Sequence, residues 1–301
     1  MSLCTNFPTV KRYIKTLRGG SHPVLAEASD GQLYVVKFRN NLQGPSLLFN
    51  EAMGSELYRA FALPVPEWKP LKVTDSFIDQ NPGLWLETAE GRMRPESGLC
   101  FGSLFLGSDA VRLLEILPGS SFRKIGNLRD FWLAWLVDVC AGHLDNRQAI
   151  YTEELGGRLT AFFVDHGHMF NGPNSNESSR FQAARYLDWR VYQPVPPQSM
   201  TDLPALELQR ITGNLQADLL WHEIKKLPEA WINFKAVQQF AKCLDNLSKS
   251  ELLRSIHETL VDAIWREQAV ATTSEFRGRR IQPASDTFSG IQIRQMVARA
   301  V

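Results

Sequence analysis

The change from strand-like to helical sequence near residue 108 constrains this 301-residue chain more than any other feature. Before that point, apolar residues recur in short runs separated by turn residues, which is typical of β-strands. After it they follow helical spacing, most strongly over Leu128 to Ala141. The sequence therefore predicts an α+β chain, with a β-rich part over residues 1–107 and a mainly helical part over residues 108–268. Residues 269–301 are expected to form a polar tail.

A tight turn is predicted at Asp30-Gly31, because apolar runs flank it and glycine accepts the positive φ that such turns need. The second run, Leu33 to Phe38, places Lys37 on a strand among apolar neighbours. A lysine there is unfavourable unless it meets an anion. Glu51, in a helix predicted over Ser46 to Phe61, is the expected partner, with Glu56 as the alternative. Taken alone, the pair is better explained by an edge-strand lysine and a solvated glutamate; combined with the two acids described below, it favours the functional interpretation.

Further elements are predicted from apolar runs and turn residues. Ala110 to Ile116 is expected to be helical, and Glu90 to Ser97 is expected to be a polar loop. Two strands, Gln148 to Thr152 and Leu159 to Val164, are expected to form a hairpin around Gly156-Gly157.

Two acidic turns follow the apolar helix. Asp145 lies in Gly142-His143-Leu144-Asp145-Asn146-Arg147-Gln148, and Asp165 follows the second hairpin strand in Val164-Asp165-His166-Gly167. A helix, loop, hairpin and loop in that order bring both acids to one edge of the hairpin. Phosphoryl transfer needs such carboxylates, one to orient or deprotonate a hydroxyl and one to hold Mg²⁺. Each acid alone is more simply a turn former, and their combination favours the catalytic interpretation.

A loop that covers phosphates should precede Lys37, and Gly19, Gly20 and Ser21 occupy that place. The segment is not a GxGxxG motif, and no GxxxxGK[ST] motif occurs, which argues against a Walker-type site. His143 and His166 flank the two acids and are candidates to brace them by hydrogen bonding.

Together these residues resemble the HipA-like kinase family, bacterial relatives of the serine/threonine and phosphoinositide kinases. The resemblance runs from about Tyr13 to Trp265. Its parts are Val35-Val36-Lys37, Phe49-Asn50-Glu51, Leu63-Pro64-Val65-Pro66, Phe101-Gly102-Ser103, Gly142 to Tyr151, Val164-Asp165-His166-Gly167 and Phe170-Asn171.

The resemblance implies a two-lobed, protein-kinase-like fold and ATP-dependent phosphoryl transfer to a hydroxyl group. The expected acceptor is a protein, and a small molecule is the alternative. It implies that Lys37 contacts ATP, Glu51 holds Lys37, Asp145 is the catalytic acid/base and Asp165 binds Mg²⁺. The family pattern places a metal-binding Asn five residues after the catalytic Asp, where this chain has Ile150. Gln148 or Asn146 is the expected substitute ligand. The departure keeps a second hypothesis open, a pseudokinase that binds nucleotide without turnover.

The composition bears on which classes of binding partner the chain can be expected to have. Lys and Arg number 33 and Asp and Glu number 32, so the net charge of +1 gives no overall attraction to nucleic acid or to an anionic membrane. Four scattered cysteines form neither a zinc motif nor a disulfide framework. With no apolar leader and no run long enough to span a bilayer, we expect a cytoplasmic protein. A helical interaction protein with coincidental motifs is a third hypothesis.

Overall fold

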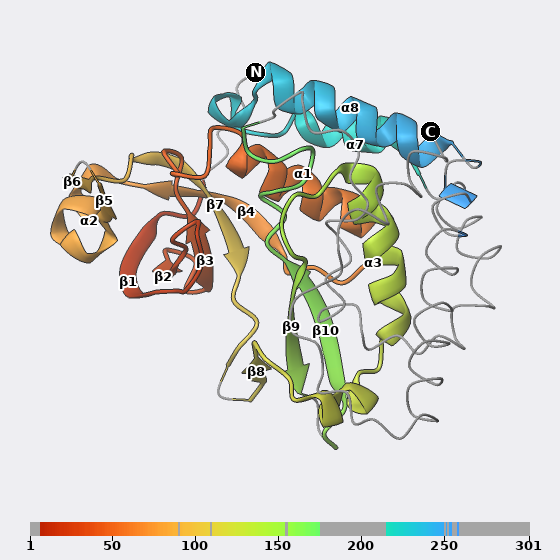
Figure 1. The fold of residues 1–301 in the computed structure, drawn as a ribbon. Helices are drawn as coiled ribbons and strands as arrows, with labels where there is room; N and C mark the ends of the chain where they lie inside the picture. The colour runs from red at the N-terminus through yellow and green to blue at the C-terminus, as the bar shows by residue number, and fades with distance from the viewer. Residues whose placement is uncertain are drawn as a thin grey trace.

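The computed structural model describes residues 7–89, 91–108, 110–153, 156–174, 215–249, 251, 253–254 and 258. Its first part is a five-stranded antiparallel sheet with the strand order β1-β2-β3-β7-β4 (Figure 1). These strands are β1 (Val10–Thr16), β2 (Val24–Ala28), β3 (Leu33–Lys37), β4 (Trp68–Val73) and β7 (Gly98–Leu104).

The two faces of this sheet serve different purposes. Tyr34 and Val36 of β3 lie in a core that is closed by the helix α2 (Asp75–Gln80) and the 3-10 turn η1 (Pro82–Leu84). Val35 and Lys37 point the other way and line a cleft. The alternation of strand side chains therefore separates a structural face from a ligand-facing one, as the sequence pattern predicts.

The helix α1 (Leu47–Ala60) crosses the centre of the molecule (Figure 1). Eleven of its residues are buried, because it contacts the sheet on one side and the second part of the chain on others. Phe49 packs edge-on against Phe170 and Phe240, which come from the second part. A helix buried nearly all round is held by tertiary packing, and it fixes the position of Glu51.

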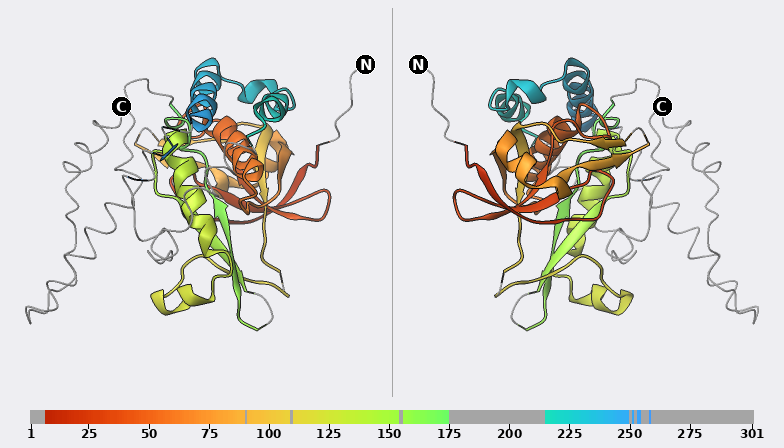
Figure 2. Two further views of the ribbon diagram at one scale, coloured as in Figure 1. Left: turned by 90° about the vertical axis from the view of Figure 1, so that its right-hand side faces the viewer. Right: turned by 90° about the vertical axis from the view of Figure 1, so that its left-hand side faces the viewer.

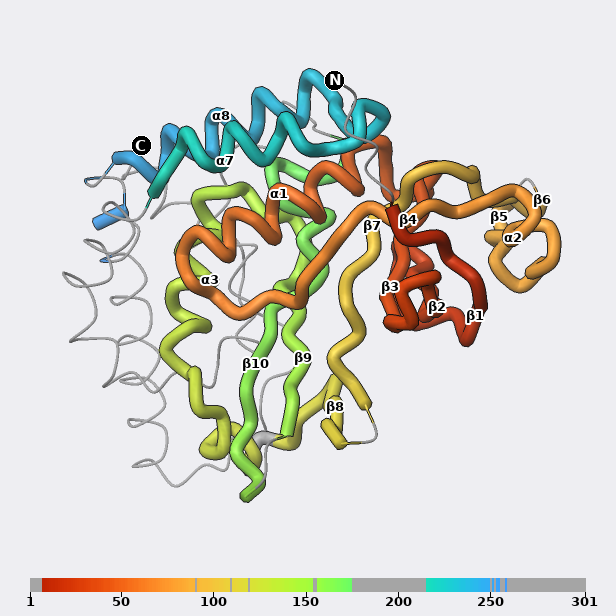
Figure 3. Tube along the Cα trace, turned by 180° about the vertical axis from the view of Figure 1, so that it is seen from behind, coloured from red at the N-terminus to blue at the C-terminus, as the bar shows by residue number. Residues whose placement is uncertain are grey.

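The second part is built on the helix α3 (Leu128–Ala141) and the hairpin of β9 (Gln148–Glu153) and β10 (Leu159–Val164). Gly142 ends α3 in the left-handed conformation, with φ of 62°, as a helix C-cap commonly does. The helices α7 (Ala217–Ile224) and α8 (Phe234–Ser248) lie above α1, linked by the 3-10 turn η4 (Glu229–Trp231) (Figures 1 and 3).

The mixed helix and strand class and the β-rich N-terminal part are as predicted, and two local predictions are wrong. The segment predicted to be helical over 110–116 contains the strand β8 (Arg112–Leu114), which adds to the edge of β9. Its run of apolar residues is too short for periodicity to distinguish helix from strand, and the free edge of β9 decides the outcome. The segment predicted to be a loop over 90–97 contains β6 (Gly91–Met93), paired with β5 (Leu86–Thr88).

Side views show α3 and the hairpin extending away from the sheet, with the 3-10 turn η2 (Gly119–Lys124) near the hairpin's far end (Figure 2). Three cysteines within the described residues, Cys100, Cys140 and Cys243, are buried free thiols. None of the described helices combines the length and apolarity needed to cross a bilayer. The predicted tail, residues 269–301, lies outside the described residues, as do residues 203–214 and 259–268 of the stretch predicted to be nearly all helix over Leu203 to Gln268.

Candidate active site

A cleft of about 840 Å³ separates the five-stranded sheet from the β9–β10 hairpin. Lys37 of β3, Glu51 of α1 and Asp165 after β10 line it, so residues 128 positions apart in sequence meet in one place. The cleft also has an apolar part. That part is formed by Val35, Leu104, Phe105, Ile150 and Phe163.

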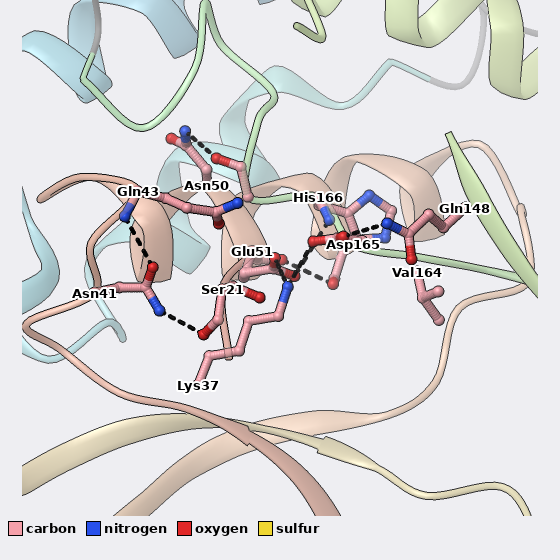
Figure 4. A network of polar contacts seen from close by, with 12 residues as sticks. Ser21, Lys37, Asn41, Gln43, Asn50, Glu51, Gln148, Val164, Asp165 and His166 are labelled. Carbon is pink, nitrogen blue, oxygen red and sulfur yellow. Dashed lines mark hydrogen bonds and ion pairs between the residues drawn. The ribbon is translucent and has the colours of Figure 1, made fainter. Parts of the chain in front are cut away.

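Lys37 is bound by two carboxylates (Figure 4). Its Nζ donates to Oε1 of Glu51 at 2.5 Å and to Oδ1 of Asp165 at 2.6 Å. Burial alone would lower the pKa of Lys37, but Asp165 and Glu51 outweigh it and raise that pKa above its ordinary value. The ammonium form of Lys37 is therefore favoured, and it lies between two carboxyl groups.

Glu51 is fixed at both oxygens. Its second oxygen, Oε2, accepts from the backbone amide of His166 at 3.2 Å. Burial and the charge of Asp165 raise the pKa of Glu51 against the opposing effect of Lys37. Glu51 thus links α1 to the segment that follows β10, as well as to β3.

Asp165 has an unusual backbone conformation, with φ of 64°. Left-handed backbone is uncommon outside glycine and, where it occurs, it marks a residue held by its surroundings. Oδ1 accepts from Lys37, and Oδ2 accepts from Nε2 of Gln148 at 2.7 Å. Burial opposes ionisation, but Lys37 more than offsets it and holds the pKa of Asp165 below its ordinary value. The side chain is 22% exposed, so this ionised carboxylate still faces the cleft.

The segment after Asp165 is tied closely to α1. Nδ2 of Asn50 donates to the carbonyls of Gly167 and Met169, each at 2.9 Å. A Cβ on Gly54 would lie 2.5 Å from Cβ of His166, and a Cβ on Gly167 would lie 2.3 Å from a methyl of Leu47. Glycine at these two positions lets the two backbones approach. Sequence reasoning assigned no role to Asn50, although a polar Asn between Phe49 and Glu51 in the predicted helix was an available signal.

The segment around Asp145 is arranged differently. Asp145 is exposed, and its Oδ1 accepts from the backbone amide of Asn146 at 2.7 Å. Asn146 and Gln148 line the cleft, whereas Asp145 lies at its rim, outside the set of described residues that form the wall. His143 is buried beneath the loop; burial and the charge of Arg147 lower its pKa to about 3, so it is neutral near pH 7.

The loop between β1 and β2 covers one end of the cleft. Gly19 and Ser21 line it, and Gly19 has φ of 136°, a conformation that side chains rarely adopt. Ser21 is buried, and its carbonyl accepts from Nδ2 of Asn41 at 2.6 Å. Gly20 packs instead toward Gln43, since a Cβ there would lie 2.9 Å from that side chain. Of the three predicted loop residues, two face the cleft and one supports the loop.

The residues present fit a magnesium ion whose shell is completed by phosphate. Among the described residues no cluster holds three or more His, Cys, Asp or Glu side chains. Mg²⁺ is commonly held by one or two carboxylates together with substrate phosphates and water. Asp165 supplies an ionised carboxylate, and the amides of Gln148 and Asn146 lie on the same cleft wall. Gln148 presents its nitrogen to Asp165, so its amide must rotate to offer oxygen to a metal.

Sequence reasoning also missed two buried charges behind the site. Arg147 and Asp138 form a fully buried ion pair, and Arg147 reaches the backbone that carries Asp165. An arginine between Asn146 and Gln148 looks like a surface residue in the sequence. Asp138 interrupts an otherwise apolar helix, and this interruption was the available signal.

No curated protein matches this chain in sequence. Among solved structures, the Helicobacter pylori proinflammatory kinase CtkA is similar with a TM-score of 0.49 and 13% identity, covering 84% of this chain and 97% of that one. The Golgi casein kinase with Mn/ADP bound has a TM-score of 0.46 and 10% identity, covering 83% of this chain and 74% of that one.

A sequence model described as HipA-like kinase matches residues 10–105. These residues comprise the five-stranded sheet and α1, and so include both Lys37 and Glu51. The resemblance inferred from the motifs is thereby confirmed over this part of the chain, which is similar to the HipA-like kinases.

Proposed function

We propose that this protein is an ATP-dependent phosphotransferase that uses Mg²⁺. The observation that carries the proposal is the buried Lys37 held between Glu51 and Asp165 at the wall of a cleft of about 840 Å³. A lysine in this setting contacts phosphates, and a carboxylate in the place of Asp165 holds the metal. The match to HipA-like kinases over residues 10–105 supports the same chemistry.

Each part of ATP has a complementary surface. The adenine ring suits the apolar part of the cleft, where Val35 and Leu104 face Ile150 and Phe163 across the opening. The phosphates suit the end at which Lys37 and the Gly19–Ser21 loop meet. Bound ATP would compete with Asp165 for Lys37, which leaves Asp165 available for the metal.

Asp165 would hold the Mg²⁺, with Gln148 and Asn146 as further ligands through their amide oxygens. The ion, when bound, supplies charge neutralisation on the phosphates. Asp145 at the rim would orient the acceptor hydroxyl or take its proton. His143, which is buried and neutral near pH 7, would support the Asp145 loop. The expected acceptor is a hydroxyl on a protein, with a small alcohol as the alternative.

Ile150 favours a second candidate function, a pseudokinase. Its position in β9, paired with Phe162, places an aliphatic side chain where the family pattern has a metal-binding Asn. An aliphatic side chain offers no ligand, so a chain of this kind can bind nucleotide and lack turnover. Both candidate functions predict that the protein binds ATP. The phosphotransferase predicts transfer of the phosphoryl group, and the pseudokinase predicts none.

The test for binding is calorimetric titration of ATP into the protein at millimolar Mg²⁺. We expect wild-type protein to bind and Lys37→Met to bind at least roughly tenfold more weakly, because the lost contact is charge-assisted. Lys69→Met is the matched control, because Lys69 of β4 pairs with Asp30 and is not among the residues that line the cleft. Equal affinity for wild type and Lys37→Met would contradict the proposal.

The test for transfer uses γ-labelled ATP with the protein alone and with candidate acceptors. Labelled protein or hydrolysed ATP in wild type, and neither in Asp145→Asn, supports the phosphotransferase. Binding that depends on Lys37 without either reaction supports the pseudokinase. A helical interaction protein with coincidental motifs predicts that Lys37→Met has no effect on nucleotide affinity.

A further inference from the structure

Arg147 is a deeply enclosed charge at the cleft wall. It lies two residues after Asp145, and its side chain and that of its partner Asp138 are both 0% exposed. Nε and Nη2 donate to the two carboxylate oxygens of Asp138, at 2.8 and 2.5 Å. This two-pronged pairing fixes the plane of the guanidinium as well as its position.

The third nitrogen of the guanidinium, Nη1, is directed at the backbone around Asp165. Nη1 donates to the carbonyl of Val164 at 2.9 Å and makes a longer contact of 3.4 Å with the carbonyl of Asp165. It also lies 3.2 Å from Nδ1 of His166. The peptide groups on both sides of the Asp165 Cα therefore meet one guanidinium, at the residue whose φ is 64°.

The same guanidinium is connected to the helix that carries Glu51. Its carbon lies 4.8 Å from the centroid of the Tyr58 ring, and the Tyr58 hydroxyl donates to Oδ1 of Asp138 at 2.7 Å. Tyr58 and Glu51 are seven residues apart on α1, which places them on one face of the helix. One buried cluster (Tyr58, Asp138, Arg147 and His166) thus joins α1, α3, the Asp145 loop and the segment after β10.

We infer that Arg147 is a positioning residue: it holds the left-handed backbone at Asp165 so that this carboxylate faces Lys37 and the metal position. The part of this inference that concerns the metal rests on the proposed function. The part that concerns the backbone of Asp165 rests on the contacts of Arg147 alone. Two peptide groups fixed by one planar donor restrict both backbone dihedrals of Asp165, which a general contribution to packing does not do.

Arg147→Lys is the informative variant. Lysine retains the charge opposite Asp138, but its single ammonium cannot bond a carboxylate with two prongs and two backbone carbonyls in fixed directions. We expect the gain in ATP affinity produced by Mg²⁺ to fall by roughly 10-fold or more, as for partners that orient a metal ligand. ATP affinity measured without divalent metal should stay near the wild-type value.

Deuterium exchange without ligand supplies a second readout that is independent of nucleotide. Arg147→Lys should exchange faster over residues 163–171 and at the wild-type rate over β1 to β3. Arg94→Lys is the matched control, because Arg94 pairs with two carboxylates, Asp75 and Asp79, away from the cleft. It should leave both readouts unchanged.

Three results decide the matter. Arg147→Lys with a wild-type Mg²⁺ gain and wild-type exchange over 163–171 overturns the inference. If Arg147→Lys does not fold, Tyr58→Phe removes the bond to Asp138 and retains the ring, and should reduce the Mg²⁺ gain by roughly 2- to 10-fold. If wild-type protein binds no ATP, the proposed function fails, and the exchange comparison still tests the positioning.

Discussion

The two acidic segments at the cleft are held in opposite ways. Asp165 is mostly buried, has a left-handed backbone, and accepts hydrogen bonds from Lys37 and Gln148. Asp145 is exposed and accepts from the amide of its own neighbour. A group that binds a metal gains from being fixed in advance, because ordering it later costs free energy. A group that meets a variable hydroxyl gains from remaining adjustable. The difference favours metal binding at Asp165 and acceptor chemistry at Asp145.

The largest expected effect is that of Asp145→Asn on transfer. Loss of a general base lowers the rate of phosphoryl transfer by roughly 10²- to 10⁴-fold. Because Asp145 is exposed, the free energy of unfolding should change by no more than about 0.5 kcal/mol. Steady-state kinetics, calorimetric titration of ATP and denaturant unfolding measure the three quantities. A parallel loss of ATP affinity would show that Asp145 is part of the nucleotide site.

Asp165→Asn should lower both ATP affinity and stability, the two quantities that Asp145→Asn should leave nearly unchanged. The affinity for ATP at millimolar Mg²⁺ should fall by roughly 10- to 100-fold, because the charged ligand is lost. Stability should fall by about 1.5 to 3 kcal/mol, since Lys37 loses one of two charged hydrogen-bond partners. Asp145→Asn, the same chemical change at an exposed site, is the control. Similar stability losses in the two variants would remove the contrast between the segments.

The residues of this site that depend on local periodicity were predicted better from the sequence than those that depend on contacts between distant segments. Strand alternation and helix spacing predict Lys37 and Glu51, because each depends on local periodicity. The left-handed backbone at Asp165 and the rim position of Asp145 depend on contacts between segments, so no local pattern shows them. Arg147 was missed for the same reason: its burial requires Asp138 on α3 and backbone carbonyls 17 and 18 residues away.

Gln148 connects the two segments, because it follows the Asp145 turn and donates to Oδ2 of Asp165. As an oxygen ligand for the metal, Gln148 should tolerate glutamate, so Gln148→Glu should bind Mg·ATP at least as tightly as wild type. Gln148→Ala should bind about fivefold more weakly, equivalent to roughly 1 kcal/mol. If Gln148 acts solely as the donor to Oδ2 of Asp165, Gln148→Glu should be the weakest binder, because it places a second negative charge beside that carboxylate.

The last expected effect is on the pH dependence of folding, through the histidine beneath the Asp145 loop. Burial and Arg147 lower the pKa of His143 from 6.5 to about 3, so as pH falls the unfolded chain takes up this proton before the folded chain does. The stability that neutral His143 contributes is complete above about pH 6.5 and is lost progressively toward pH 3. The free energy of unfolding, measured with denaturant between pH 7 and pH 4, should therefore depend less steeply on pH in His143→Gln than in wild type. The exposed His222→Gln is the control. Because His166 is buried and its pKa is also lowered, the variant should retain part of the wild-type slope, whereas an unchanged slope would mean that His143 is protonated alike in both states.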